Sequence, residues 1–237
     1  MGNPLRKYPD AGTRGLPSIV YNEVPWQEIQ YNMAKGWGYQ NDFVVGRSST
    51  TVYKDFLTTV INAGTIADAG LIGGVIALTP TGTENDAVEC QGTEAFYIDA
   101  GYKLAFGVRF KVTDADEQDL VAGLCITDTT ACAGTSDEVA FRLADGSANL
   151  LYSVTKDSGT AAADTGEDVE DVTFLTCEFL VDGEDKVEFY VDNELVTTVT
   201  SGLPNDEVLA LTLGTQTGDG SANLMYIDWV YAAQWVK

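Results

Sequence analysis

The chain has 237 residues, with 13 Lys and Arg against 36 Asp and Glu, so its formal net charge is −23. Apolar residues make up 45%, which is typical of globular proteins and too high for a disordered acidic chain. Histidine is absent, which excludes Ser-His-Asp and Cys-His nucleophile systems and every zinc site that needs imidazole.

The first 40 residues differ from the rest of the chain in charge and in pattern. Residues 1–50 hold five basic and four acidic residues, a net charge of +1, so residues 51–237 carry −24. Four of the six prolines lie in this first stretch, and a helical pattern is limited to one turn near residues 25–34. Residues 1–40 are therefore predicted to form an extended N-terminal arm. Its many aromatic side chains indicate that the arm lies along a surface, its own or a partner's.

From about residue 52 onward the sequence predicts one strand after another. Lys103–Val112 alternates between apolar and polar residues, which places Leu104, Phe106, Val108 and Phe110 on one core face. Asp185–Asp192 repeats this pattern with Val187, Phe189 and Val191, and the turn Asp192-Asn193 joins it to Glu194–Val199 as a hairpin. Further strands are expected at Leu71–Leu78, Ala87–Gln91, Ala95–Asp99, Leu120–Ile126, Val139–Leu143, Ala148–Val154, around 175–181 and 209–213, and at Ala222–Tyr231.

About a dozen short strands without a long helical period are typical of an all-β protein. The pattern predicts a single two-sheet sandwich or jelly roll over residues 41–237. Such a body buries enough apolar surface to fold without a metal or a disulfide.

Candidate catalytic and metal-binding groups are few. Glycoside hydrolysis needs two carboxylates facing one another on a sheet, and the nearest arrangement is Glu188, Asp192 and Glu194, of which the last two straddle the hairpin turn. The sequence therefore predicts no catalytic residues and no enzymatic activity. Asp114–Asp119 alternates like a calcium loop but lacks the glycine and the distal glutamate of an EF-hand, and a charged turn explains it equally well. No metal and no cofactor are expected.

Cysteines and C-terminal aromatic residues offer weaker signals. Cys90, Cys125, Cys132 and Cys177 are scattered, so they are interpreted as small buried side chains, although Cys125 and Cys132 can face each other across a short loop. The aromatic residues of 222–235 suit either the core, which is favoured, or an exposed sugar-binding face.

Membrane and nucleic-acid contacts are not expected. No segment reaches the ~18–20 apolar residues needed to span a bilayer. The first 15 residues carry charge and proline where a signal peptide would be apolar, so secretion is not supported. The strong negative charge argues against binding to a phosphate backbone.

Several stretches together resemble head decoration or minor capsid proteins of tailed bacteriophages that have a concanavalin A-like jelly roll. The stretches that carry the resemblance are Asn41–Phe43, Gly73–Leu78, Leu104–Asp114, Gly123–Asp128, Val139–Gly146, Val187–Pro204 and Leu224–Val230. The resemblance covers roughly residues 41–235 and implies a concanavalin A-like jelly roll, a structural role in a virion and no catalytic residues.

This resemblance and the arm lead to the functional hypothesis of a capsid decoration (cement) protein on the outer capsid surface. Its partner would be the assembled major capsid protein, and the chain would form a homo-oligomer there. The arm would bind the capsid or a neighbouring subunit through Arg6, Lys7, Tyr8, Arg14 and Trp26. The alternative is a carbohydrate-binding module of a head or tail fibre that attaches to host glycans.

Overall fold

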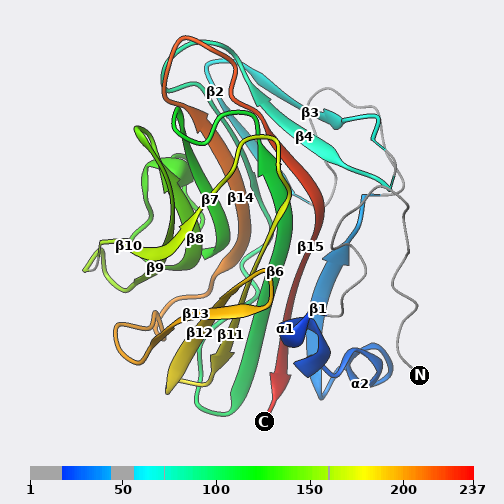
Figure 1. The fold of residues 1–237 in the computed structure, drawn as a ribbon. Helices are drawn as coiled ribbons and strands as arrows, with labels where there is room; N and C mark the ends of the chain where they lie inside the picture. The colour runs from blue at the N-terminus through cyan, green and yellow to red at the C-terminus, as the bar shows by residue number, and fades with distance from the viewer. Residues whose placement is uncertain (1–17, 44–55, 72, 160) are drawn as a thin grey trace.

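The computed structural model describes residues 18–43, 56–71, 73–159 and 161–237, which form two antiparallel β-sheets packed face to face (Figure 1). The eight-stranded sheet, here sheet A, has the order β13-β12-β11-β6-β15-β4-β3, with β1 beside β15. Its strands are β1 (Gly36–Asn41), β3 (Gly64–Asp68), β4 (Ile76–Pro80), β6 (Tyr102–Val112), β11 (Leu175–Asp182), β12 (Lys186–Val191), β13 (Glu194–Val199) and β15 (Met225–Val236).

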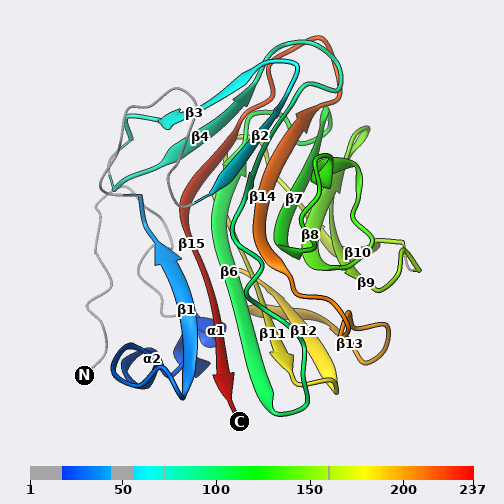
Figure 2. The same cartoon turned by 180° about the vertical axis from the view of Figure 1, so that it is seen from behind.

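The seven-stranded sheet, here sheet B, has the order β10-β9-β8-β7-β14-β5-β2 and is seen from behind in Figure 2. Its strands are β2 (Leu57–Ile61), β5 (Ala87–Gln91), β7 (Gln118–Cys125), β8 (Glu138–Ala144), β9 (Ser147–Thr155), β10 (Ala163–Asp168) and β14 (Ala210–Thr217). The predicted all-β sandwich is therefore confirmed. No helix among the described residues is long and apolar enough to cross a membrane.

The core lies between the two sheets and uses alternate positions of each strand. All seven residues that the alternation placed in the core are buried: Leu104, Phe106, Val108, Phe110, Val187, Phe189 and Val191. Phe106 stacks on Phe179 within sheet A with ring centroids 5.0 Å apart, and Phe141 of sheet B meets Phe189 edge-on at 5.2 Å. These aromatic contacts join the two sheets through a continuous apolar layer.

Local backbone geometry explains where the strands begin and end. Asp192 and Asn193 both have positive φ, 46° and 72°, which is the two-residue hairpin turn expected between β12 and β13. The strand expected at Leu71–Leu78 begins only at Ile76, because Gly73 and Gly74 adopt φ of 101° and 79°. The strand expected at Ala95–Asp99 is reduced to a single bridge between Phe96 and Leu209.

The N-terminal segment is folded onto the sandwich from residue 18 onward. It forms two short helices, α1 (Ile19–Glu23) and α2 (Trp26–Tyr31), followed by β1. β1 pairs with β15 without interruption, from Gly36 opposite Trp235 to Asn41 opposite Val230. The boundary expected between an arm at 1–40 and a sandwich at 41–237 thus falls inside β1. The described part of the arm is helical and paired rather than extended, it lies along the protein's own surface, and α2 falls within the helical turn expected near residues 25–34.

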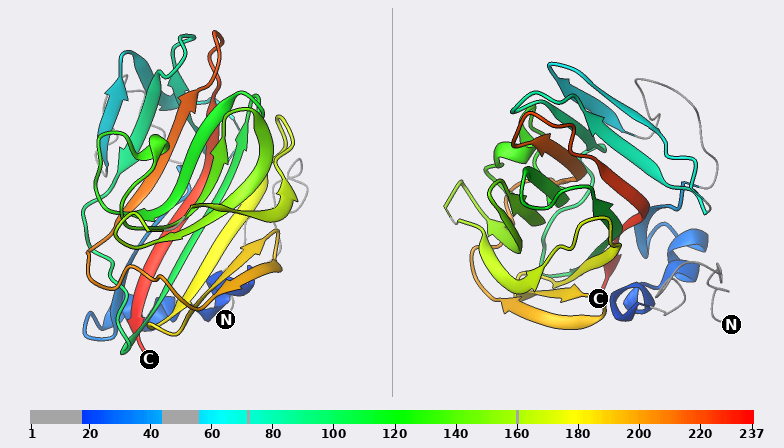
Figure 3. Two further views of the ribbon diagram at one scale, coloured as in Figure 1. Left: turned by 90° about the vertical axis from the view of Figure 1, so that its left-hand side faces the viewer. Right: turned by 45° about the horizontal axis from the view of Figure 1, so that its top comes forward.

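Both outer faces of the sandwich carry additional chain. α1 and α2 lie against the outer face of sheet A, beside β1 and the end of β15 (Figures 1 and 3). On the outer face of sheet B lies the loop 128–134, which contains the 3-10 turn η1 (Ala131–Ala133). Small side chains on sheet B make room for this loop: a Cβ added to Gly214 would lie 2.8 Å from Cys132 Sγ.

Candidate functional site

The residues predicted to bind a capsid or a neighbouring subunit fall into two groups. Arg6, Lys7, Tyr8 and Arg14 lie outside the described residues. Trp26 lies in α2 with its ring turned toward sheet A, where its centroid is 5.2 Å from that of Tyr21 and 5.9 Å from that of Tyr231. Much of the Trp26 ring is therefore already in contact with the protein's own surface.

A second apolar cluster, separate from the core, holds α1 and α2 against sheet A. Its buried members are Val20, Val24, Ile29, Ala105, Leu180, Tyr231, Ala233 and Trp235, and Tyr21, Trp26, Tyr190 and Trp229 pack around them. Gly107 is needed at its centre, because a Cβ there would lie 2.4 Å from a ring carbon of Tyr231. The bare backbone of Gly107 lets this ring lie across β6 and reach β11.

A buried carboxyl group lies where the Tyr231 ring ends. Glu178 of β11 is 1% exposed, and its Oε1 accepts hydrogen bonds from the Tyr231 hydroxyl at 2.5 Å and from the Ser18 hydroxyl. Ser18 also caps α1, because its Oγ accepts the backbone N–H of Tyr21 at 2.9 Å. Burial raises the pKa of Glu178 to about 6, although both hydrogen bonds lower it. This cluster of Ser18, Glu178 and Tyr231 connects the start of α1 with two strands of sheet A.

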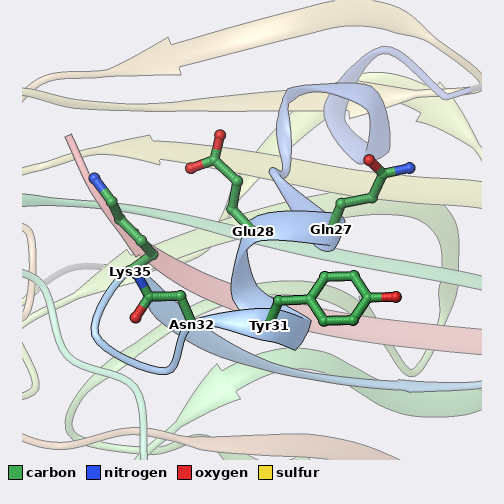
Figure 4. Close-up of a pocket in the computed structure, with 5 residues that line it drawn as sticks. All are labelled: Gln27, Glu28, Tyr31, Asn32 and Lys35. Atoms are coloured by element: carbon green, nitrogen blue, oxygen red, sulfur yellow. The ribbon is translucent and has the colours of Figure 1, made fainter.

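The opposite side of α2 carries a shallow cavity of about 430 Å³, called here the α2 pocket (Figure 4). It is lined by Gln27, Glu28, Tyr31, Asn32 and Lys35. In Figure 4 the side chains of Glu28 and Lys35 extend to the same side, and the Tyr31 ring projects in another direction, away from Lys35 and Asn32. Tyr31 is 88% exposed, which makes its ring a free apolar surface bordered by polar groups.

The backbone around the α2 pocket is fixed at both ends. The Asn32 N–H donates to the Glu28 carbonyl at 2.8 Å, which ends α2, and Asn32 Oδ1 then accepts the N–H of Ala34 at 3.1 Å. The carbonyl of Lys35 accepts the N–H of Val236 at the end of β15 at 2.9 Å. The pocket is thus attached to the sheet through β15 and through the inner face of α2.

The chemistry of the α2 pocket suits a ligand with one apolar face and several hydroxyl groups. An exposed phenol ring offers a flat surface for stacking. Amides, a carboxylate and an ammonium group supply donors and acceptors around it. The sequence offered one signal for this pocket: within the expected helical turn, Gln27 and Tyr31, and Glu28 and Asn32, are spaced four apart and share a face.

Two of the three carboxylates considered for glycoside hydrolysis have structural partners. Glu188 accepts a hydrogen bond from Lys186 at 2.7 Å. Asp192 lies in the hairpin turn and accepts the N–H of Thr176 at 3.0 Å, and Glu194 is exposed at the start of β13. These three groups do not assemble into one site.

The loop considered for calcium lies beside two other acidic turns. Burial, Asp145 and Asp219 all raise the pKa of Glu117 in this loop. Both turns have the same sequence, Asp-Gly-Ser-Ala-Asn, at residues 145–149 and 219–223. Each turn donates a hydrogen bond to the loop: the N–H of Gly146 to the Asp116 carbonyl at 2.7 Å, and the side-chain amide of Asn223 to the Glu117 carbonyl at 2.5 Å. Among the described residues, no three side chains of the metal-binding types come together as a site.

The remaining candidates are structural. All four cysteines are free and buried, and burial raises the pKa of Cys90 to about 12. Tyr231 and Trp235 of the C-terminal aromatic run are 2% and 7% exposed beneath α1 and α2, and Tyr226 and Trp229 are half-buried. The interpretation of this run as packing residues therefore holds for the two most buried rings.

No protein-family profile matches the sequence, and no curated protein matches it significantly. The solved structures that are similar to this chain have a concanavalin A-like jelly-roll fold. A protein of unknown function from Shewanella oneidensis MR-1 matches with a TM-score of 0.59 and 20% identity, covering 90% of this chain and 95% of that one. The β-glucanase of Bacillus licheniformis matches with a TM-score of 0.56 and 14% identity, covering 84% and 98%. The carbohydrate recognition domain of Emp46p in its potassium-bound form matches with a TM-score of 0.54 and 10% identity, covering 75% and 88%.

These similarities correct the prediction that the chain is not an enzyme. The β-glucanase is an enzyme, and so is an endo-β-1,4-glucuronan lyase from the fungus Trichoderma reesei, which matches at 11% identity with a TM-score of 0.57 over 81% of this chain and 94% of that one. Missing histidine and missing carboxylate spacing do not exclude catalysis, because this fold is shared by enzymes and by binding domains. At these identities the likeness establishes the fold alone.

Proposed function

We propose that this chain is a carbohydrate-binding jelly-roll module and that the α2 pocket is its binding site. The observation that carries the proposal is the Tyr31 ring, which is 88% exposed in a pocket that is also lined by amide, carboxylate and ammonium groups. The similarity in fold to a domain named as a carbohydrate recognition domain supports it. Such a module on a head or tail fibre would attach the particle to host glycans.

Sugar rings match this surface because they combine an apolar C–H face with a rim of hydroxyl groups. The C–H face stacks on Tyr31, while Gln27, Glu28 and Asn32 exchange hydrogen bonds with the rim. The pocket is shallow and has one exposed ring, so affinity for a single sugar is weak, and several copies acting together would supply useful avidity. The net charge of −23 favours neutral glycans over polyanionic ones.

The test is binding of neutral oligosaccharides to the full chain, measured by calorimetry and by retention on a glycan array. Tyr31→Ala should reduce affinity at least tenfold, because about 1.4 kcal/mol is a modest value for losing a stacked ring. Met33→Ala is the matched control, since Met33 is 86% exposed nearby but does not line the pocket. Equal binding by the wild type and Tyr31→Ala, or no binding by either, would contradict the proposal.

The same incubations should be analysed for shortened or unsaturated oligosaccharides, because enzymes share this fold. If products appear, Glu28→Gln separates two cases. Loss of turnover with retained binding would assign the Glu28 carboxylate to the chemistry, whereas unchanged turnover would place the reaction outside the α2 pocket.

The second candidate is capsid decoration, and its support is the sequence resemblance over residues 41–235. We propose the major capsid protein as the partner and the outer capsid surface as the location, with Arg6, Lys7, Tyr8 and Arg14 as contacts. Co-sedimentation with DNA-free capsids tests this role. A chain lacking residues 2–17 should lose capsid occupancy while keeping the fold described here, and unchanged occupancy would exclude these four residues as the attachment.

A further inference from the structure

We infer that Glu178 is a positioning residue for the α2 pocket: with Ser18 and Tyr231 it forms a buried latch that holds residues 18–32 on sheet A and makes this docking dependent on pH. The inference rests on the proposed function only for its consequence, glycan binding, and the latch itself can be tested without a glycan.

Glu178 is positioned beneath the N-terminal segment. Glu178 lies on the outer face of sheet A, beneath α1, and is 1% exposed because the N-terminal segment covers it. Its hydrogen bond to Ser18 joins residues 160 positions apart, and Ser18 in turn caps α1. A second polar contact closes the same end of the segment, since the N–H of Ile19 donates to Asn193 Oδ1 at 3.0 Å. The latch therefore lies at the start of the described segment, ahead of α1.

The latch is connected to the α2 pocket through Tyr231 and Trp26. Tyr231 donates to Glu178 and also packs edge-on against Tyr21 and Trp26, with centroids 5.2 and 5.9 Å away. Trp26 begins α2, and the pocket residues occupy the other side of this short helix. Release of α1 from Glu178 would remove Tyr21, one of the two rings against which Trp26 packs, and so weaken the support of the inner face of α2.

The surroundings of Glu178 disfavour its ionised form. One other carboxylate, Asp192 of the β12–β13 turn, lies near Glu178. The neighbouring titratable groups are otherwise phenols: Tyr190, which is paired with Glu178 across β12, Tyr231 of β15 and Tyr21 of α1. On β6 the residue paired with Glu178 is Gly107. Asp192 opposes ionisation of Glu178, and Oε2 of Glu178 is buried without a hydrogen-bond partner among the described residues. An ionised Glu178 is thus costly under the docked segment.

The direction of the pH effect follows from linkage. The docked pKa of Glu178, about 6, lies above the ordinary value of 4.5 that an exposed carboxyl regains when the segment lifts. Docking is therefore strongest below pH 4.5 and weakens as pH rises through 6. With these two values, opening of the segment increases about 8-fold between about pH 5 and about pH 7.5.

The experiment is hydrogen–deuterium exchange of the full chain, following the peptide that covers residues 18–32. Rates in the wild type are divided by those in Glu178→Gln at the same pH, which removes the intrinsic pH dependence of exchange. We expect this ratio to rise about 8-fold over that pH range. Glu207→Gln, at an exposed loop position, is the matched control and should keep the wild-type pH dependence.

A second variant keeps the latch testable if Glu178→Gln fails to fold. Tyr231→Phe retains the ring but removes a hydrogen bond that lowers the pKa of Glu178, so the midpoint of the pH dependence should move to higher pH. A flat exchange ratio in Glu178→Gln, or an unmoved midpoint in Tyr231→Phe, would overturn the latch.

Glycan binding forms a separate arm of the experiment. If the proposed function holds, affinity should fall with rising pH in the wild type and stay constant in Glu178→Gln. Exchange that follows the prediction in a chain that binds no glycan would support the latch and refute the proposed function. Glycan binding together with an exchange ratio that does not change with pH would support the proposed function and refute the latch.

Discussion

The two outer faces of the sandwich are covered in chemically different ways. On sheet A the cover is residues 18–32, distant in sequence and held mainly by apolar side chains around Tyr231, with the carboxyl of Glu178 as its buried acid. On sheet B the cover is the local loop 128–134, whose backbone accepts hydrogen bonds from Arg142, a residue that is itself ion-paired with Glu138 of the same strand. The buried acid beneath the cover on sheet A changes its charge with pH, whereas the arginine that holds the cover on sheet B stays charged over the ordinary pH range.

Arg142 is the centre of the attachment on sheet B. Its guanidinium group donates to the carbonyls of Ala131 and Cys132 at 3.1 Å each and pairs with Glu138. Glu89 adds a further bond by accepting the N–H of Cys132 at 2.8 Å. Ala131 and Cys132 are therefore buried against sheet B, where residues of β5, β7, β8 and β14 contact them, whereas the loop residues on either side of these two are exposed.

The largest expected effect is that of Arg142→Met. The change leaves the Glu138 carboxylate, which is 3% exposed, without its cation. It also removes the side-chain donor from the Cys132 and Ala131 carbonyls, of which Ala131 keeps the N–H of Gly134. Removing one partner of a buried ion pair costs about 3–5 kcal/mol, so the free energy of unfolding should fall by that amount in urea.

The matched control is Lys156→Met. Lys156 pairs with Asp206 at 3.1 Å, and both side chains are at least one-third exposed. Exposed ion pairs contribute about 0–1 kcal/mol, so this change should lower the free energy of unfolding by no more than about 1 kcal/mol. Equal effects of the two substitutions would show that the attachment on sheet B is no stronger than a surface contact.

Trp26→Ala examines the apolar cover and should have the next largest effect. The substitution removes a half-buried ring that contacts Tyr21 and Tyr231, and the free energy of unfolding should fall by about 2 kcal/mol. Gln30→Ala, at an exposed position of the same helix, is the control. If Trp26→Ala keeps the wild-type free energy of unfolding but binds capsids more weakly, Trp26 contacts a partner, as the sequence predicted.

The sequence predicted the sandwich well because strand alternation depends on local pattern. Lys103–Val112 and Asp185–Asp192 have unbroken period-two patterns, and the structure buries the predicted face of each. It predicted the N-terminal segment poorly, because the residues that cover Val20 and Ile29 come from the far end of the chain. Only the tertiary contact with Tyr231 and Trp235 shows that these aromatic residues pack within the molecule.

The candidate site was harder to predict than the fold. Glu178 has no sequence signal, because a glutamate at an outward strand position is ordinarily solvated. Its burial depends on Ser18, 160 positions away, and on the absence of a side chain at Gly107. The α2 pocket had a spacing signal in Gln27 and Tyr31, but only the packing of α2 shows which side of the helix is free.

A smaller effect concerns the pH dependence of two carboxylates on sheet B. Burial raises the pKa of Glu89, so its contribution to stability is present below its ordinary pKa of 4.5 and is lost as pH rises. Burial alone would raise the pKa of Glu138, but the hydrogen bond and charge of Arg142 lower it, so its contribution is present above 4.5 and is lost as pH falls.

Glu89→Gln should therefore become more stable relative to the wild type as pH rises, and Glu138→Gln less stable. Urea unfolding at several pH values between about 4 and 7 measures both differences. Slopes of the same sign would show that Arg142 does not control the charge state of Glu138.

The smallest expected change in stability is that of Tyr31→Ala, and it tests whether α2 has two independent sides. Trp26 and Tyr31 are five residues apart, which places them about 140° apart around the helix axis, and only Trp26 contacts sheet A. Because the Tyr31 ring is 88% exposed, its loss should change the free energy of unfolding by no more than about 0.5 kcal/mol. Glycan affinity should nevertheless fall at least tenfold, since the ring is the stacking surface of the α2 pocket. A loss of stability as large as that of Trp26→Ala would mean that Tyr31 supports the fold, and the exposed ring could then no longer be assigned to a ligand.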